Sequence, residues 1–247
     1  ASSVFSSSYQ SWTNLVIGGT VTSIGSSAFS GCTGLTGVEI GNGVTSIGSS
    51  AFYNCYAIRD VTFNANLPSF QASSVFSSSY QSWRNLVIGT SVTNIGSGAF
   101  SGCSGIRDVT LNANLPSFTA SSVFSGSYQS WTNLVIGGTV TNIGSSAFSG
   151  CTGLTSVTIP DGVAGIGDYA FKACTGLTSV TIGTGVTIGT GVTSIGNQAF
   201  SGCTGLTDVE IGSGVTGIGS QAFYNCTKLT HITVDASNLF YSDVEGV

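Results

Sequence analysis

Residues 32–55 read CTGLTGVEIGNGVTSIGSSAFYNC, and most of the chain repeats this pattern. The stretch at 35–40 has the form L-x-x-V-x-I, whose end alternates apolar and polar residues as a half-buried β-strand does. Val44 and Ile47 follow between glycines, which permit the backbone to bend sharply. The unit is therefore predicted to carry the chain through one coil, with one long strand and one short strand or extended turn.

The last part of the unit is predicted to form a short helical turn. Ser49 or Ser50 can cap such a turn through its hydroxyl group. Ala51, Phe52 and Cys55 then share the face that points into the core. A coil built in this way has a strand on one side and a helical turn on the other.

Seven cysteines stand at one position of this repeat, separated by 23, 48, 48, 23, 29 and 23 residues: Cys32, Cys55, Cys103, Cys151, Cys174, Cys203 and Cys226. In the two longest gaps we align Tyr80 and Tyr128 with the cysteines, and Tyr9 begins the series. A fixed period in the low twenties is typical of a solenoid whose coils pack on their neighbours. We predict an α/β repeat solenoid of about ten coils, with a parallel β-sheet on one face and short helical turns on the other.

The units that contain tyrosine differ from the rest, because the two complete ones include the string Asn-Leu-Pro-Ser-Phe at 66–70 and 114–118. Aligning Leu67 and Phe70 with Val44 and Ile47 suggests that bulkier side chains replace the usual ones together. Residues 61–108 and 109–156 differ at only 11 of 48 positions, which indicates a duplication. A nearly copied six-residue stretch at 183–188 is expected to form a loop, since a solenoid tolerates such an insertion.

The composition excludes several classes of protein. Charged residues make up 6% of the chain and the formal net charge is −5, so no nucleic-acid partner is expected. No stretch approaches the ~18 consecutive apolar residues of a membrane span, and we expect any targeting signal to lie outside residues 1–247. The chain opens within a unit, at 1–12, and stops at Val247 without an obvious polar cap. We therefore expect residues 1–247 to be a single solenoid and a piece of a longer chain, cut within repeats at both ends.

The string Cys-Thr-Gly-Leu-Thr-Ser-Val-Thr-Ile-Pro-Asp-Gly-Val at 151–163 resembles the BspA-like, or treponemal-type, leucine-rich repeat, and so does the string at 24–35. The motif covers about seven of the ten units. The resemblance implies a secreted or surface-attached protein, often an adhesin for matrix proteins or neighbouring cells. It provides no catalytic residues.

The sequence offers little for chemistry, and we expect no enzyme activity, no cofactor and no bound metal. The cysteines are at least 23 residues apart, whereas zinc sites place them two to four apart. Buried free thiols are the favoured interpretation, although a Cys32–Cys55 disulfide remains open. The one histidine, His231, is expected on the surface of the last strand, and the spacing of Asp235, Asp243 and Glu245 does not match a calcium loop.

One column of the predicted sheet departs from the background. Two residues before the first strand valine, three successive units carry Arg59, Arg84 and Arg107 where the others carry threonine. The adjacent column places three polar side chains beside them: Asp60, Asn85 and Asp108. This pattern indicates either a ladder of surface ion pairs, which adds little stability, or a guanidinium stripe that binds a carboxylated glycan or an acidic protein loop.

Two classes of function therefore remain. The first is a cell-surface or extracellular module that binds a protein or glycan through its sheet. The second is a structural rod of a stalk, sheath or filament, built from copies of itself. Ice binding by a threonine-rich face is disfavoured, because valine and arginine interrupt the threonine columns.

Overall fold

The computed structural model describes residues 11–182 and 191–242. They form two compact units. The first contains residues 11–113 and 122–128, and the second contains residues 114–121 and the described residues from 129 onward. Residues 1–10 and the six-residue copy at 183–188 lie outside the described residues, and the prediction of one continuous body over 1–247 stays a prediction.

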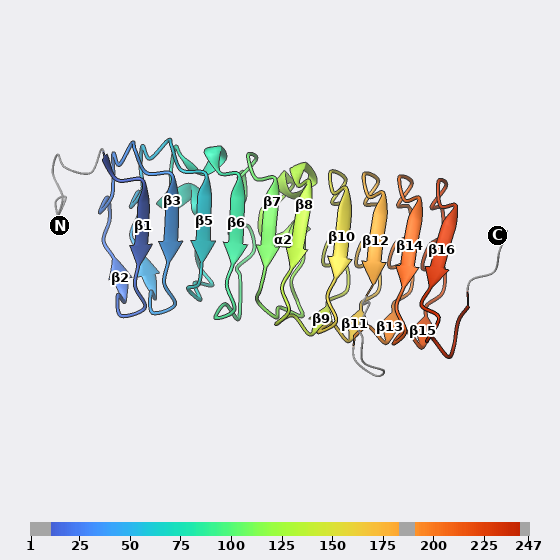
Figure 1. Ribbon diagram of the computed structural model, residues 1–247. Helices are drawn as coiled ribbons and strands as arrows, with labels where there is room; N and C mark the ends of the chain where they lie inside the picture. Colours follow the sequence, from blue (N-terminus) through green and yellow to red (C-terminus); the bar gives the residue numbers. More distant parts are fainter. Residues whose placement is uncertain (1–10, 183–190, 243–247) are drawn as a thin grey trace. The chain divides into compact units, whose positions relative to one another are not determined.

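Each unit contains a parallel sheet of long strands, one from each coil (Figure 1). Neighbouring strands pair in register, so that Val38 lies opposite Val61 in the first unit and Val157 opposite Val180 in the second. The first unit contains β1 (Asn14–Ile17), β3 (Gly37–Ile40), β5 (Asp60–Phe63), β6 (Asn85–Ile88) and β7 (Asp108–Leu111). The second contains β8 (Asn133–Ile136), β10 (Ser156–Ile159), β12 (Ser179–Ile182), β14 (Asp208–Ile211) and β16 (His231–Val234).

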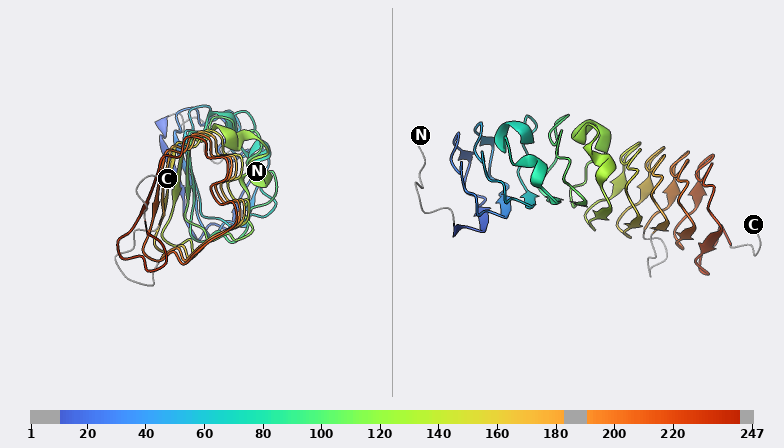
Figure 2. Two further views of the ribbon diagram at one scale, coloured as in Figure 1. Left: turned by 90° about the vertical axis from the view of Figure 1, so that its right-hand side faces the viewer. Right: turned by 90° about the horizontal axis from the view of Figure 1, so that it is seen from above.

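The predicted second strand is present as a two-residue strand in most coils. These strands also pair in parallel. Figure 2 shows the coils from two further sides. In the first unit they are β2 (Ser23–Ile24) and β4 (Ser46–Ile47); in the second they are β9 (Asn142–Ile143), β11 (Gly165–Ile166), β13 (Ser194–Ile195) and β15 (Gly217–Ile218). The described chain is thus a parallel β-solenoid, as the repeat period predicted.

The core of each unit contains phenylalanine rings of successive coils that stack on one another. In the second unit the ring of Phe171 lies 5.2 Å from Phe148 on one side and 5.2 Å from Phe200 on the other. In the first unit Phe52 stacks in the same way between Phe29 and Phe76, at 5.1 and 4.6 Å. Stacked aromatic rings bury large apolar areas, so these columns are a main source of stability.

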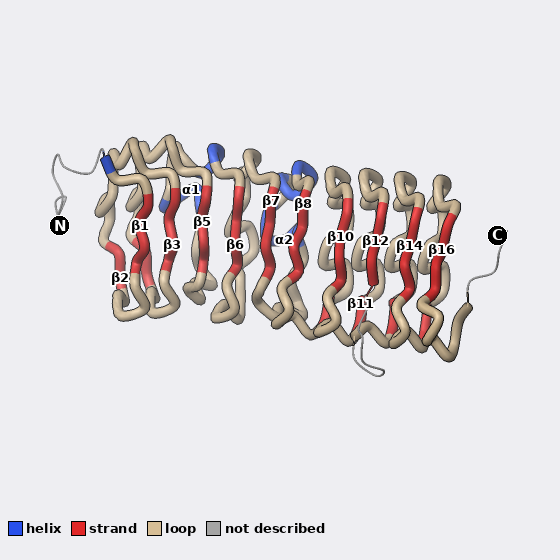
Figure 3. The backbone as a smooth tube through the Cα atoms, viewed as in Figure 1, coloured by secondary structure: helices blue, strands red, loops and turns tan. Residues whose placement is uncertain are grey.

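Opposite the long strands, the regular coils form successive turns and not the predicted helical turn (Figure 3). Ser50 does not cap a helix, because its φ is 58° and its N–H donates to Ser74 O of the next coil at 2.8 Å. The N–H of Ala51 bonds within its own coil, to Gly48 O, and that of Phe52 again reaches the next coil, at Val75 O. Alternate N–H groups therefore join neighbouring coils, whereas an α-helix would direct them along its own axis.

Short helices occur in the units that contain tyrosine, where the chain has α1 (Ala72–Val75), η2 (Tyr80–Ser82), α2 (Ala120–Phe124) and η3 (Ser127–Ser130). The alignment of Tyr80 with the cysteines is wrong by one residue. Ser79 is fully buried, and its hydroxyl lies 2.7 Å from Phe76 O and 3.1 Å from Phe52 O, much as the Cys55 thiol lies 3.1 Å from Phe29 O. Tyr80 is the extra residue, and its ring lies against Gly102.

The residue before each cysteine has a positive φ, which glycine adopts without strain. Gly150 and Gly202 have φ of 76°, and asparagine, which tolerates this region, provides the residue in two other coils. Ala173 has φ of 58° and is the departure from this rule. Its side chain is partly exposed, so removing it creates no cavity.

We therefore expect Ala173→Gly to stabilise the second unit by about 0.5–1 kcal/mol, because the strain of an L-residue in this region exceeds the entropy that glycine adds to the unfolded chain. Urea denaturation followed by circular dichroism measures the change. Ala164→Gly is the control, since Ala164 is exposed and has no positive φ. Destabilisation by Ala173→Gly would contradict the strain argument.

Candidate binding site

The arginine column predicted from the sequence lies on three successive coils of the first unit. Arg59, Arg84 and Arg107 each directly precede a long strand, and their backbones are joined in a ladder, with Arg84 N to Arg59 O at 2.7 Å and Arg107 N to Arg84 O at 2.9 Å. Arg59 and Arg84 are exposed, and Arg107 is half-buried. Adjacent strands of a sheet lie ~4.8 Å apart. The three arginines therefore lie side by side at the N-terminal ends of β5, β6 and β7.

Two of the three guanidinium groups are held by carbonyl oxygens of the loop before their own strand. Nη1 of Arg59 donates to Tyr56 O and Ile58 O, both at 2.9 Å. Arg107 repeats this geometry with Ser104 O and Ile106 O, again at 2.9 Å. These contacts fix the side chains by one nitrogen and orient them before any partner arrives.

Arg84 reaches forward to the next coil, where its Nη1 donates to Gly105 O at 2.8 Å. A guanidinium group has five N–H donors. Among the described residues, Arg59 and Arg84 use only Nη1 and bond to no carboxylate. The interpretation as a ladder of ion pairs therefore does not describe these two side chains.

The neighbouring polar column is in the predicted register, since Asp60 lies opposite Asn85 and Asn85 opposite Asp108. The amide of Asn85 donates to the carboxylate of Asp60. This bond joins β5 to β6 and leaves the guanidinium group of Arg59 without a carboxylate partner. The six predicted residues thus lie together, with the cations and the carboxylates in separate columns.

In regular coils threonine holds the arginine position and has a structural role. The hydroxyl of Thr36 donates to Thr13 O at 2.9 Å, and the hydroxyl of Thr178 donates to Thr155 O at 2.9 Å. An arginine at this position has no hydroxyl to make this bond, and its guanidinium group donates to loop carbonyl groups instead. Threonine is therefore a substitution that this position accepts.

The cysteines are free thiols, as predicted, and the one at 226 is the least buried of the seven. The thiol of Cys174 donates to Phe148 O at 3.2 Å and so links its coil to the one before, as do the thiols of Cys55, Cys203 and Cys226. Burial raises the pKa of the Cys55 thiol to about 12, with the neighbouring Cys32 as a smaller cause. A thiol that stays protonated is a poor nucleophile and metal ligand, so these residues are structural.

His231 begins β16 on the surface, as predicted. Its Nδ1 lies 3.3 Å from Asp208 Oδ1 and 2.9 Å from the hydroxyl of Thr230. The side chains of His231 and Asp208 are 71% and 58% exposed, so this pair is solvated. Within residues 11–182 and 191–242 no three or more His, Cys, Asp or Glu side chains form a metal-binding group, and Asp243 and Glu245 lie outside that range.

A model of the BspA type leucine rich repeat region matches residues 1–129, 71–190 and 184–243 in six copies. The chain belongs to this family. Among the curated proteins no match was found. Three solved structures of similar fold are a leucine-rich repeat protein from Bacteroides ovatus, a leucine rich cell surface protein from Faecalibacterium prausnitzii and the leucine rich repeat protein of T. pallidum.

The likeness to these structures is modest. The Bacteroides protein is 22% identical with a TM-score of 0.41, over 88% of this chain and 73% of its own. The Faecalibacterium protein is 22% identical with a TM-score of 0.33, over 95% and 83%. The T. pallidum protein is 20% identical with a TM-score of 0.37, over 89% and 79%. Within the described residues of the present chain, no helix has the length and apolar character needed to span a bilayer.

Proposed function

We propose that this family member is a binding module of a secreted or cell-surface protein, and that the arginine column binds a partner rich in carboxylates. The observation that carries the proposal is that Arg59 and Arg84 are exposed and bond to no carboxylate of the described chain. A cation that is already paired with its neighbour has little left for a ligand. These two guanidinium groups keep donors that face solvent.

The chemistry of the partner follows from the guanidinium group. Arginine binds carboxylates through two parallel N–H donors, and its planar head is more weakly hydrated than an ammonium group. Repeating cations on adjacent coils suit a ligand whose carboxylates also repeat. Acidic protein segments and carboxylated glycans share this chemistry, and polyglutamate and hyaluronan are probes for the two sources.

Removing the column is expected to weaken binding of such a probe by about tenfold or more, which corresponds to ~1.4 kcal/mol. The variant is Arg59→Thr, Arg84→Thr and Arg107→Thr together, because threonine occupies this position in other coils. Isothermal titration at low and at 0.5 M salt measures the affinity, and the parent's affinity should fall with salt. Circular dichroism should give the same melting temperature for both proteins.

The control for net charge is Lys172→Thr with Lys228→Thr, which removes the two other basic side chains of the sequence. This variant should bind the probe as the parent does. Sedimentation velocity over a range of concentrations separates the alternative, a structural rod, because that function requires concentration-dependent polymers. Unchanged binding by the threonine variant would exclude the arginine column as a site.

A further inference from the structure

The short strands of successive regular coils are joined by backbone hydrogen bonds. In the first unit, Thr45 N donates to Thr22 O at 2.8 Å and Gly48 N donates to Ile24 O at 2.8 Å. The second unit repeats the pattern, with Thr216 N to Thr193 O at 2.9 Å. Two carbonyl groups, two residues apart, are thus satisfied by the next coil at each step.

This pattern stops at the outer edge of β4. Pro68 stands where the regular coil has Thr45, and proline has no N–H to donate. Among the described residues, no donor reaches the carbonyl oxygens of Thr45 and Ile47. The carbonyl oxygens of Thr45 and Ile47 correspond to those of Thr22 and Ile24, and they are therefore open acceptors at β4.

A second difference from the regular coils indicates that the backbone at residue 71 is separated from the preceding coil. In regular coils a glycine follows the short strand because the backbone lies against the preceding coil, and a Cβ added at Gly167 would meet Ser145 N at 2.7 Å. Gln71 stands at this place in the coil of Pro68. A residue with a side chain fits because the close approach to the preceding coil is absent.

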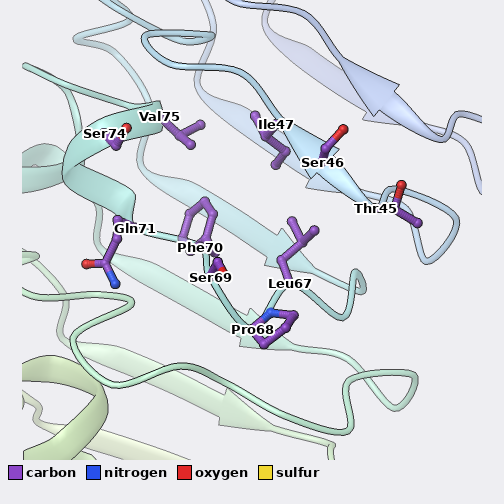
Figure 4. Close-up of a pocket in the computed structure, with 10 residues that line it drawn as sticks. All are labelled: Thr45, Ser46, Ile47, Leu67, Pro68, Ser69, Phe70, Gln71, Ser74 and Val75. Atoms are coloured by element: carbon purple, nitrogen blue, oxygen red, sulfur yellow. The ribbon is translucent and has the colours of Figure 1, made fainter.

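The opening is a groove of ≈ 360 Å³, which lies within the range of ~300–1,000 Å³ that is usual for ligand pockets. Its apolar wall is formed by Ile47, Leu67, Phe70 and Val75. Figure 4 shows these side chains between β4 and the segment that follows β5. Hydroxyl groups and one amide complete the lining, from Thr45, Ser46, Ser69, Ser74 and Gln71, and no charged residue lines the groove.

We propose that this groove binds an uncharged, extended peptide segment that pairs in parallel with β4. In regular coils two such acceptors receive the N–H groups of residues three apart, as Thr45 and Gly48 show, and a bound peptide repeats that conformation. Of the apolar wall, Ile47 is partly exposed and can pack against an apolar side chain of the peptide, whereas Leu67, Phe70 and Val75 are buried. A neutral sugar fits less well, because the aromatic ring of the groove, Phe70, is 5% exposed and offers no free face. The site uses none of the arginines.

The test uses the peptide Ac-Gly-Val-Thr-Ser-Ile-Gly-NH2, which has the sequence of residues 43–48. A fluorescein-labelled form should bind the chain saturably in a fluorescence-anisotropy titration. Methylation of the amide nitrogens of its threonine and last glycine should weaken binding by about tenfold or more, because these two N–H groups correspond to the donors of Thr45 and Gly48. Equal binding by the methylated peptide would overturn the pairing.

A matched pair of variants locates the site. Ser73 and Ser74 are adjacent and exposed on α1, and only Ser74 lines the groove. Ser74→Tyr should weaken peptide binding by about tenfold or more, and Ser73→Tyr should leave it within about twofold. Equal melting temperatures would show that both variants fold. No saturable peptide binding, equal loss in both variants, or binding of cellohexaose in place of the peptide would each overturn the proposal.

Discussion

Phe171→Ala is expected to lower the free energy of unfolding of the second unit by about 3–5 kcal/mol. Its side chain is fully buried, and its ring stacks on Phe148 and Phe200 at 5.2 Å on each side. Truncation removes the transfer free energy of the ring and leaves a cavity in a close-packed column. The neighbouring coils are joined by N–H groups of the turns, such as Phe171 N to Ala199 O at 2.7 Å, so they cannot collapse freely into the space.

Urea denaturation of the parent and the variant measures this effect. The control is Phe240→Ala, because Phe240 is 63% exposed and its truncation should change the free energy of unfolding by less than about 0.5 kcal/mol. A Phe171→Ala variant that unfolds at the same urea concentration as the parent would refute the assignment of this position to the core.

The sequence predicted the coil, its long and short strands and the inward positions because apolar spacing and glycine placement determine them directly. It did not predict the turns. An Ala-Phe-x-x-Cys stretch is compatible with a helical turn, and the deciding feature is a pair of positive φ angles in each coil, as at Ser27 and Gly31. The glycine before most cysteines indicates one of the two positive φ angles. The other falls on serine, at Ser27, Ser50 and Ser146, and a serine in the sequence does not indicate it.

The tyrosine units show the same limit for side chains. Tyr80 was aligned with the cysteines by its spacing from Cys55 and Cys103, whereas the position holds a small buried side chain, such as Ser79. Counting three residues from Phe76, as from Phe52 to Cys55, would have found Ser79. The missing donor of Pro68 was likewise readable from the sequence, but its consequence for β4 required the register of the coils.

The arginine column was predictable because strand register converts sequence period into a surface column. Its hydrogen bonds were not, since a guanidinium group beside Asp60 could equally have formed an ion pair. In the structure, Arg59 instead donates hydrogen bonds to loop carbonyl groups, and Asp60 accepts one from Asn85. Contacts of long side chains depend on rotamers, which a periodic pattern does not determine.

Raising the pH above about 9 is expected to destabilise the chain steeply. Burial raises the pKa of the Cys103 and Cys151 thiols, and hydrogen bonding with Cys174, followed by burial, raises the pKa of Cys203. Their folded-state pKa lies above the ordinary thiol value of 9.0. The folded state therefore binds more protons, and stability present below pH 9 is lost as the pH rises toward the folded values.

The size of the effect follows from the number of protons released on unfolding. Each thiol whose folded-state pKa is well above 9, as for Cys103 and Cys151, lowers the free energy of unfolding by about 1.4 kcal/mol per pH unit above 9. For Cys55 the window runs from pH 9 to about 12. Urea denaturation between pH 7.5 and 10.5, with a reductant present, measures the slope.

Cys103→Ser is the matched variant, because Ser79 shows that a hydroxyl can occupy this position while fully buried. Serine does not titrate in this range, so the slope should decrease by about 1.4 kcal/mol per pH unit. The thiols of the parent should also resist a disulfide reagent at pH 8 until urea unfolds the chain. A free energy of unfolding that does not change with pH would contradict a ladder of buried thiols, because a solvated thiol has the same pKa in the folded and unfolded chain. Rapid modification of the native chain would contradict it as well.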